Sequence, residues 1–180
     1  MARGWINPVW AHRLIFAGAA AFLMFVRLLP LHPAAAGHLP GPDIILCLAF
    51  AWTMRRPEYL PVWLLAAVLL LEDFLVMRPP GLWTALVLIA TEFIRSRVAL
   101  TRELSFSVEW LMVGALMFGV FFTYRLIFAL AFLPQPGLAF AAVQILWSIA
   151  AYPLAVAISR YGLDLRKPAA GELGVDGRPL

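Results

Sequence analysis

Two adjacent acidic residues, Glu72 and Asp73, stand at the far end of an apolar stretch that begins near Pro61. In bilayer hydrocarbon an unpaired carboxylate is costly or takes up a proton, so these acids need partners or water. Arg27 and Arg125 each interrupt another apolar stretch and can supply guanidinium donors. These residues therefore predict a buried charge layer, with Asp73 as its central acceptor and Arg125 as a bidentate donor.

Helix geometry places these charges at a similar depth. At about 1.5 Å per residue from the inner ends of their helices, Arg27 lies about 20 Å, Asp73 about 18 Å and Arg125 about 22 Å into the membrane. A neutral set of ion pairs that holds the helices in register is the favoured interpretation. A path for an ion or a substrate is the alternative.

The composition is that of a membrane protein. Of the 180 residues, 63% are hydrophobic and 13% are charged, and the mean hydropathy is +0.88, far above the range of soluble domains. The net charge of +4 and the pI of about 9.8 could suggest nucleic acid as a partner. However, the basic residues stand at the ends of apolar stretches and form no single patch. They predict membrane topology and no nucleic-acid partner.

The remaining reactive residue types indicate no enzyme. Cys47 is the only cysteine and lies within an apolar stretch, which predicts a small buried side chain without a disulfide or a thiolate metal site. His12, His32 and His38 have no ligand spacing with carboxylates. The sequence contains no nucleophile elbow or Walker loop, and the paired acids lack the magnesium-binding repeat of membrane phosphotransferases. We therefore expect no catalytic, metal-binding or cofactor-binding residues.

Apolar stretches and helix breakers predict an all-α membrane protein, a polytopic bundle of about six transmembrane helices. Asp43 is the predicted N-cap of the second helix. The second and fourth helices are short, so tilt, local thinning of the bilayer and half-buried placement all remain open. Pro153 should leave the carbonyl of Ile149 without its helical donor. The predicted helices are Leu14–Leu31, Ile44–Met54, Pro61–Met77, Leu82–Ile94, Val108–Leu133 and Leu138–Ser159.

The distribution of arginine predicts the orientation. If six helices alternate, Arg78 is the only basic residue in the connectors of the outer side, and the rest of the connector charge lies inside. Both termini should then be cytoplasmic. Residues 1–163 would form the membrane domain, residues 164–180 a disordered cytoplasmic tail, and Val98–Ser107 a polar connector. A cleavable signal peptide, with Ala34–Ala36 as the cleavage site, is the less favoured interpretation of the first stretch.

Short motifs in the middle of the chain carry a family resemblance. A Pro-Asp pair opens a short apolar helix, Arg-Arg-Pro closes it, and the next helix ends in an aspartate that is followed by a Pro-Gly step. This order resembles the bacterial rod-shape-determining membrane proteins of the MreD family. Leu70–Glu72 stands where that family usually places Gly-Leu. The motif positions are Pro42, Asp43, Arg56, Pro57, Asp73, Pro80 and Gly81.

The resemblance implies a non-enzymatic scaffold of the cell-elongation machinery for peptidoglycan synthesis. Its implied partner is MreC and, through MreC, a class B penicillin-binding transpeptidase, a RodA-type glycosyltransferase and MreB filaments. Small residues suited to helix contacts in lipid are Gly18, Ala21, Ala151 and Ala155. The family is also similar in fold to the substrate-binding subunits of energy-coupling-factor vitamin transporters, so a small-molecule carrier is the alternative. An outward polar cavity would favour the carrier, whereas a scaffold can fill that space with side chains.

Overall fold

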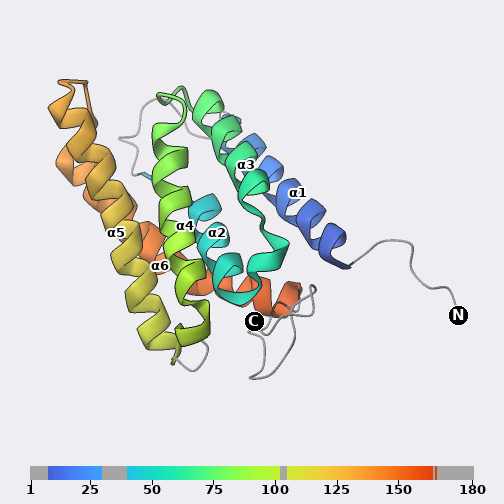
Figure 1. Cartoon of the computed structure of the whole chain (residues 1–180). Helices are drawn as coiled ribbons and strands as arrows, with labels where there is room; N and C mark the ends of the chain where they lie inside the picture. The colour runs from blue at the N-terminus through green and yellow to red at the C-terminus, as the bar shows by residue number, and fades with distance from the viewer. Residues whose placement is uncertain (1–7, 30–39, 102–104, 164, 166–180) are drawn as a thin grey trace, which may run out of the picture.

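The computed structural model describes residues 8–29, 40–101, 105–163 and 165, and all regular structure in these ranges is helical. Successive long helices alternate in direction, and α6 crosses obliquely behind the others (Figure 1). The elements are α1 (Pro8–Leu28), α2 (Ile44–Arg55), the 3-10 turn η1 (Pro57–Tyr59), α3 (Val62–Leu75), α4 (Leu82–Thr101), α5 (Phe106–Leu130) and α6 (Leu138–Gly162).

The short helix α2 forms the centre of the fold. It packs against α6, α4, α1 and η1, and Phe50 and Trp52 are among its fully buried side chains. A helix that is apolar on all sides has no solvent-facing stripe, so it is stable only when other helices enclose it. Asp43 is the N-cap of α2, as predicted, and its side chain accepts from the N–H of Leu46 at 3.2 Å. Enclosure explains how a helix too short to span alone is accommodated.

A buried polar network holds the C-terminal end of α2. Arg55 Nη1 donates to Glu109 Oε1 on α5 at 2.9 Å, and the hydroxyl of Tyr152 on α6 donates to the same oxygen at 2.8 Å. The exposed fraction of the Glu109 residue is 1%. Because the carboxylate accepts from both neighbours, its charge is compensated inside the protein. The network joins α2, α5 and α6.

Helices α5 and α6 approach closely. A Cβ at Gly114 would lie 3.4 Å from Cγ2 of Ile149, so the absence of a side chain at Gly114 permits this spacing. The helix α6 continues through Pro153. The indole Nε1 of Trp110 donates to the carbonyl of Ile149 at 2.8 Å. Pro153 cannot donate to that carbonyl, and Trp110 supplies the missing donor from the neighbouring helix.

Within the described ranges, three helices are long and apolar enough to cross a membrane: α1 from Val9, α5 and α6. The prediction of a helical membrane protein is confirmed at this level. The helix α3 has 14 residues and reaches about 21 Å. The helix α4 extends to Thr101, so the prediction that a connector begins at Val98 is wrong. The predicted tail lies almost entirely outside the described residues.

Candidate functional site

The site is built where α3 ends and the chain turns into α4. Met77 has a φ of 55°, and the N–H of Arg78 donates to the carbonyl of Asp73 at 2.9 Å, which closes the end of α3. This turn reverses the chain and brings the Arg78 side chain back over the last turn of α3. Arg78 Nη2 donates to Glu72 Oε1 at 3.0 Å.

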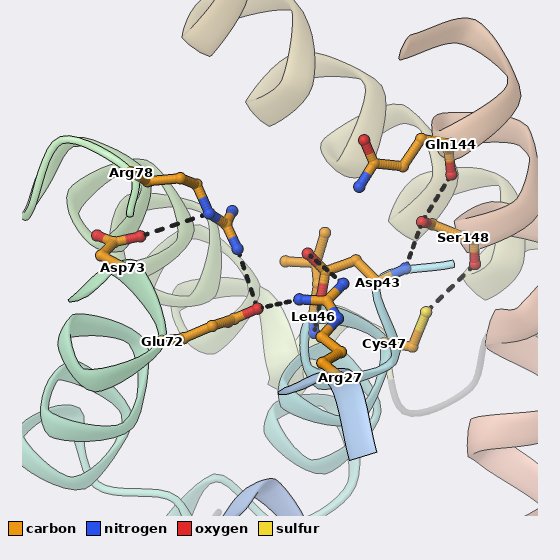
Figure 2. Close-up of polar contacts among 9 residues, drawn as sticks. All are labelled: Arg27, Asp43, Leu46, Cys47, Glu72, Asp73, Arg78, Gln144 and Ser148. Atoms are coloured by element: carbon orange, nitrogen blue, oxygen red, sulfur yellow. Dashed lines mark hydrogen bonds and ion pairs between the residues drawn. The ribbon is translucent and has the colours of Figure 1, made fainter. Parts of the chain in front are cut away.

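Glu72 is the central acceptor of the charged site, and it is fully buried. Besides Arg78, its Oε1 accepts from Nη1 of Arg27 on α1. Figure 2 shows the two guanidinium groups converging on this carboxylate, one from α1 and one from the link between α3 and α4. Both arginines therefore bind Glu72 and offset the charge of its carboxylate inside the protein. The prediction that Asp73 occupies this central position is therefore wrong.

Asp73 instead holds the N-terminal end of α4. Its Oδ2 accepts from the N–H of Gly81 at 3.0 Å and from the hydroxyl of Thr84 at 2.9 Å. The Nε of Arg78 lies 4.0 Å from Asp73 Oδ1, at the limit of an ion pair. A carboxylate at a helix N-terminus satisfies free amides and is favoured by the helix dipole. Gly81 has a φ of 94°, a conformation that a side chain disfavours.

Asp43 caps the N-terminal end of α2, as Asp73 does for α4. Its N–H donates to Ser148 Oγ on α6 at 2.9 Å, and its Oδ2 lies 3.9 Å from Arg27 Nη2. One turn later the thiol of Cys47 donates to the carbonyl of Ser148 at 3.2 Å (Figure 2). The prediction that Cys47 is a small buried side chain is confirmed. These contacts join the charged site to the packing of α2 against α6.

Arg125 does not contact the acidic residues. Its Nη1 donates to the carbonyl of Pro136 at 3.0 Å, and its own carbonyl accepts from Gln135 at 3.1 Å. The prediction that Arg125 is the bidentate donor to Asp73 is therefore wrong. The α5–α6 connection supplies a backbone acceptor within reach of Arg125, which depth along the helix alone cannot reveal. Arg125 nevertheless lines the same cavity as Arg27, Glu72 and Arg78.

This cavity has a volume of about 500 Å³. Its apolar walls come mostly from α1, α3, α5 and α6, and include Leu28, Phe121 and Phe140. The polar groups converge on it from four helices and two links. They are Arg27, Glu72, Arg78, Tyr124, Arg125, Gln135 and Gln144. A concave, mostly apolar site with a few convergent polar groups has the form of a ligand site.

Two arginines that form buried ion pairs, Arg78 and Arg55, were predicted from the sequence only as loop charges. The involvement of Arg78 depends on a left-handed residue at Met77, which sequence does not favour at a methionine. Arg55 lies in the Arg-Arg-Pro stop signal, yet it is buried against Glu109. The other arginine of that signal, Arg56, pairs with Glu58 at 3.4 Å. The sequence signal that could have indicated a buried partner for Arg55 is Glu109, an acid inside the longest apolar stretch.

The predicted helix-contact positions divide into two groups. On α1, Gly18 and Ala21 are exposed, and nothing lies within 4 Å of a Cβ built at Gly18. On α6, Ala155 is buried and Ala151 is half-buried against the core. The two α6 positions therefore pack within the protein, and the two α1 positions face outward.

No protein family, curated protein or solved structure matches this chain. Among the residues that the structure describes, no group of three or more His, Cys, Asp or Glu side chains is placed to hold a metal ion. The carboxylate of Glu92 lies 3.4 Å from Nε of Arg95 on the same helix. It lies near the middle of α4 and does not line the cavity of the charged site.

Proposed function

We propose that this chain is a non-enzymatic scaffold of the bacterial cell-elongation machinery, of the MreD type, in the inner membrane. It pairs with MreC and, through MreC, with a class B penicillin-binding transpeptidase, a RodA-type glycosyltransferase and MreB. The sequence resemblance described above is the basis of this proposal. The geometry of the motif residues adds support.

The supporting observation is that Asp73 and Gly81 form one hydrogen-bonded unit. The motif aspartate at the end of α3 accepts from the glycine N–H of the Pro-Gly step at the start of α4. The positive φ of Gly81 explains why a glycine stands at this step. Asp43, in the other motif, caps α2. The motif residues thus have joint roles in building the fold, as expected for a scaffold.

In this proposal all six helices are embedded in the membrane and both termini are cytoplasmic. Three helices are long and apolar enough to span, while α2 is enclosed by its neighbours and α3 and α4 would complete the bundle. The outward side chains of the helices are largely apolar, for example Leu14, Phe22 and Leu126, as lipid contact requires. Arg78 lies in the outer link, where it is neutralised by Glu72.

The outward face of α1 is the proposed contact for the single transmembrane helix of MreC. Small residues allow close helix approach in lipid, where hydrophobic burial gives little drive for association. Gly18 and Ala21 supply such a surface, and large apolar side chains at Phe22 and Phe25 border it.

Affinity isolation in mild detergent from bacteria that also express MreC tests the proposal. We expect MreC to be recovered with the chain. The amount of MreC recovered should fall several-fold in Gly18→Leu. Because the space around Gly18 is open, this variant should keep the thermal stability of the parent. Ala85→Leu, an exposed small residue of α4, is the matched control and should retain MreC. Absence of MreC from the parent isolate would contradict the proposal, whereas an unaffected Gly18→Leu would move the contact to another helix.

The cavity favours a second candidate, the substrate-binding subunit of a small-molecule transporter. A space of about 500 Å³ with three arginines and two glutamines is what a carrier needs and a filled scaffold lacks. A screen of water-soluble vitamins by thermal stability of the purified chain distinguishes the two candidates. One vitamin that stabilises the chain, with loss of the effect in Gln144→Leu, would support the carrier.

A further inference from the structure

The charged groups around the cavity are unevenly distributed. Among the described residues that line it, Arg27, Arg78 and Arg125 are basic and Glu72 is the one acid. The first two arginines share the Glu72 carboxylate. Arg125 binds only the carbonyl of Pro136 among the side-chain contacts that the structure gives it. The lining therefore carries more basic than acidic side chains, within walls that are mostly apolar.

The neighbouring acids offset part of this excess but do not reach Arg125. Asp73 Oδ1 lies 4.0 Å from Arg78 Nε, and Asp43 Oδ2 lies 3.9 Å from Arg27 Nη2. Neither acid lines the cavity, and neither forms an ion pair with Arg125 in the part of the chain that the structure describes. An arginine without a carboxylate partner is costly at membrane depth unless an anion or water reaches it. Arg125 is therefore suited to bind an anionic group from outside the chain.

A second, apolar groove meets the cavity at Arg125. It has a volume of about 350 Å³, lies between α5 and α6, and shares Arg125, Gln135 and Ala141 with the cavity. Its other lining residues are Phe118, Phe122, Leu126, Ala129, Leu138, Ala142 and Ile145, all apolar. The cavity with its arginines is thus joined to a groove that is lined by apolar side chains and lies on the lipid-facing side.

We propose that the cavity and the groove together bind one anionic phospholipid. The headgroup phosphate lies near the three arginines, and an acyl chain follows the groove between α5 and α6. Guanidinium groups recognise phosphate oxygens by charge-assisted, bidentate hydrogen bonds, and the groove buries methylene groups against aromatic and aliphatic side chains. The shared residues place head and chain on one molecule. This inference rests on the membrane placement in the proposed function and is independent of the pairing with MreC.

Native mass spectrometry of the purified chain in a non-ionic detergent tests the ligand class. Phosphatidylglycerol should bind with one-to-one stoichiometry and about tenfold or more tighter than phosphatidylcholine, since the net charge of the headgroup is recognised. Glycerol 3-phosphate, the soluble headgroup probe, should bind far more weakly because it lacks the chain. Equal binding of the two lipids would overturn the proposal. Binding of glycerol 3-phosphate as tight as that of phosphatidylglycerol would assign a soluble anion and would also overturn it.

Paired variants test the two compartments separately. Arg125→Gln should weaken the binding of phosphatidylglycerol about tenfold and that of phosphatidylcholine less, because only phosphatidylglycerol carries a net negative charge. Arg160→Gln, at an exposed arginine at the far end of α6, should change neither. Ala142→Trp should fill the groove and weaken the binding of both lipids. Ala85→Trp, which lies outside the cavity and the groove, should leave the binding of both unchanged. Parent-like binding in both Arg125→Gln and Ala142→Trp would overturn the assignment. The co-isolation of MreC is a separate measurement, so either proposal can fail alone.

Discussion

Arg78 folds back from the link after α3 and donates to Glu72 across 3.0 Å, so the last turn of α3 and the following link form one charged unit. Arg27 joins this unit from α1. The adjacent Asp73 is free to cap α4 because Glu72 accepts from both arginines. The two acids, which stand next to each other in the sequence, thus have different roles in positioning three helices.

Glu72→Ala should be strongly destabilising because it leaves Arg27 and Arg78 without their common acceptor. Removing one partner of a buried ion pair typically costs ~3–5 kcal/mol of unfolding free energy. Glu72→Gln should cost less, since the amide oxygen still accepts a hydrogen bond. Thermal unfolding in detergent compares the stability of the parent, Glu72→Ala and Glu72→Gln. The double variant Glu72→Ala, Arg78→Ala should recover part of the stability that Glu72→Ala loses.

The matched control for this experiment is Glu92→Ala. The Glu92 side chain is 53% exposed and pairs with Arg95 on the same helix, an arrangement worth less than ~1 kcal/mol. Equal losses in Glu72→Ala and Glu92→Ala would show that Glu72 is not the buried acceptor described here.

Gly81→Ala should lower the unfolding free energy by about 1 kcal/mol or more, because φ is 94° at this position. Nothing lies within 4 Å of a Cβ there, so the cost is conformational and not steric. Gly119→Ala, also in open space but within α5, is the control and should cause no loss. Chemical or thermal unfolding of the two variants gives the comparison, and an unaffected Gly81→Ala would refute the turn geometry.

Trp110→Phe should cost ~1 kcal/mol of unfolding free energy, since it removes the donor to the Ile149 carbonyl. In a Pro153→Ala background the same substitution should cost less, because the new N–H at position 153 can donate to that carbonyl within α6. A double-mutant cycle measures this coupling, for which we expect about 0.5–1 kcal/mol. Strictly additive losses would mean that Trp110 does not compensate for the proline.

Reporter fusions should place both ends of the chain in the cytoplasm and the segment between α1 and α2 in the periplasm. A reporter active only in the periplasm should be positive when fused near Gly37 and negative when fused after Arg166. The expectation follows from the concentration of arginine at one end of the helices. A positive reporter after Arg166 would contradict the proposed orientation.

Much of the helical framework could be predicted from composition and helix breakers. Pro42–Asp43 and Pro79–Gly81 mark boundaries by local backbone chemistry, which acts within a few residues. The released carbonyl of Ile149 follows in the same way from the missing N–H of Pro153. The donor that reaches it, Trp110, depends on how α5 packs against α6 and is not encoded locally.

The charged site was predicted only in part. Helix rise gives the depth of Arg27, Asp73 and Arg125, but the direction in which each side chain points depends on packing. Glu72 and Asp73 lie about 100° apart around α3, so only the tertiary structure decides which of them meets the arginines. The reversal of the chain at Met77, a residue rarely left-handed, then places Arg78 where the sequence indicated a loop charge.

Depletion of this chain in the bacterium that produces it tests the role in cell elongation most directly. The measurement is the ratio of cell length to cell width during growth, followed by microscopy, with re-expression of the parent chain as the control. If the chain is an MreD-type scaffold, rods should shorten, widen and become round within a few generations, and the parent chain should restore them. Cells that keep their length-to-width ratio after the protein has disappeared would contradict the proposed function.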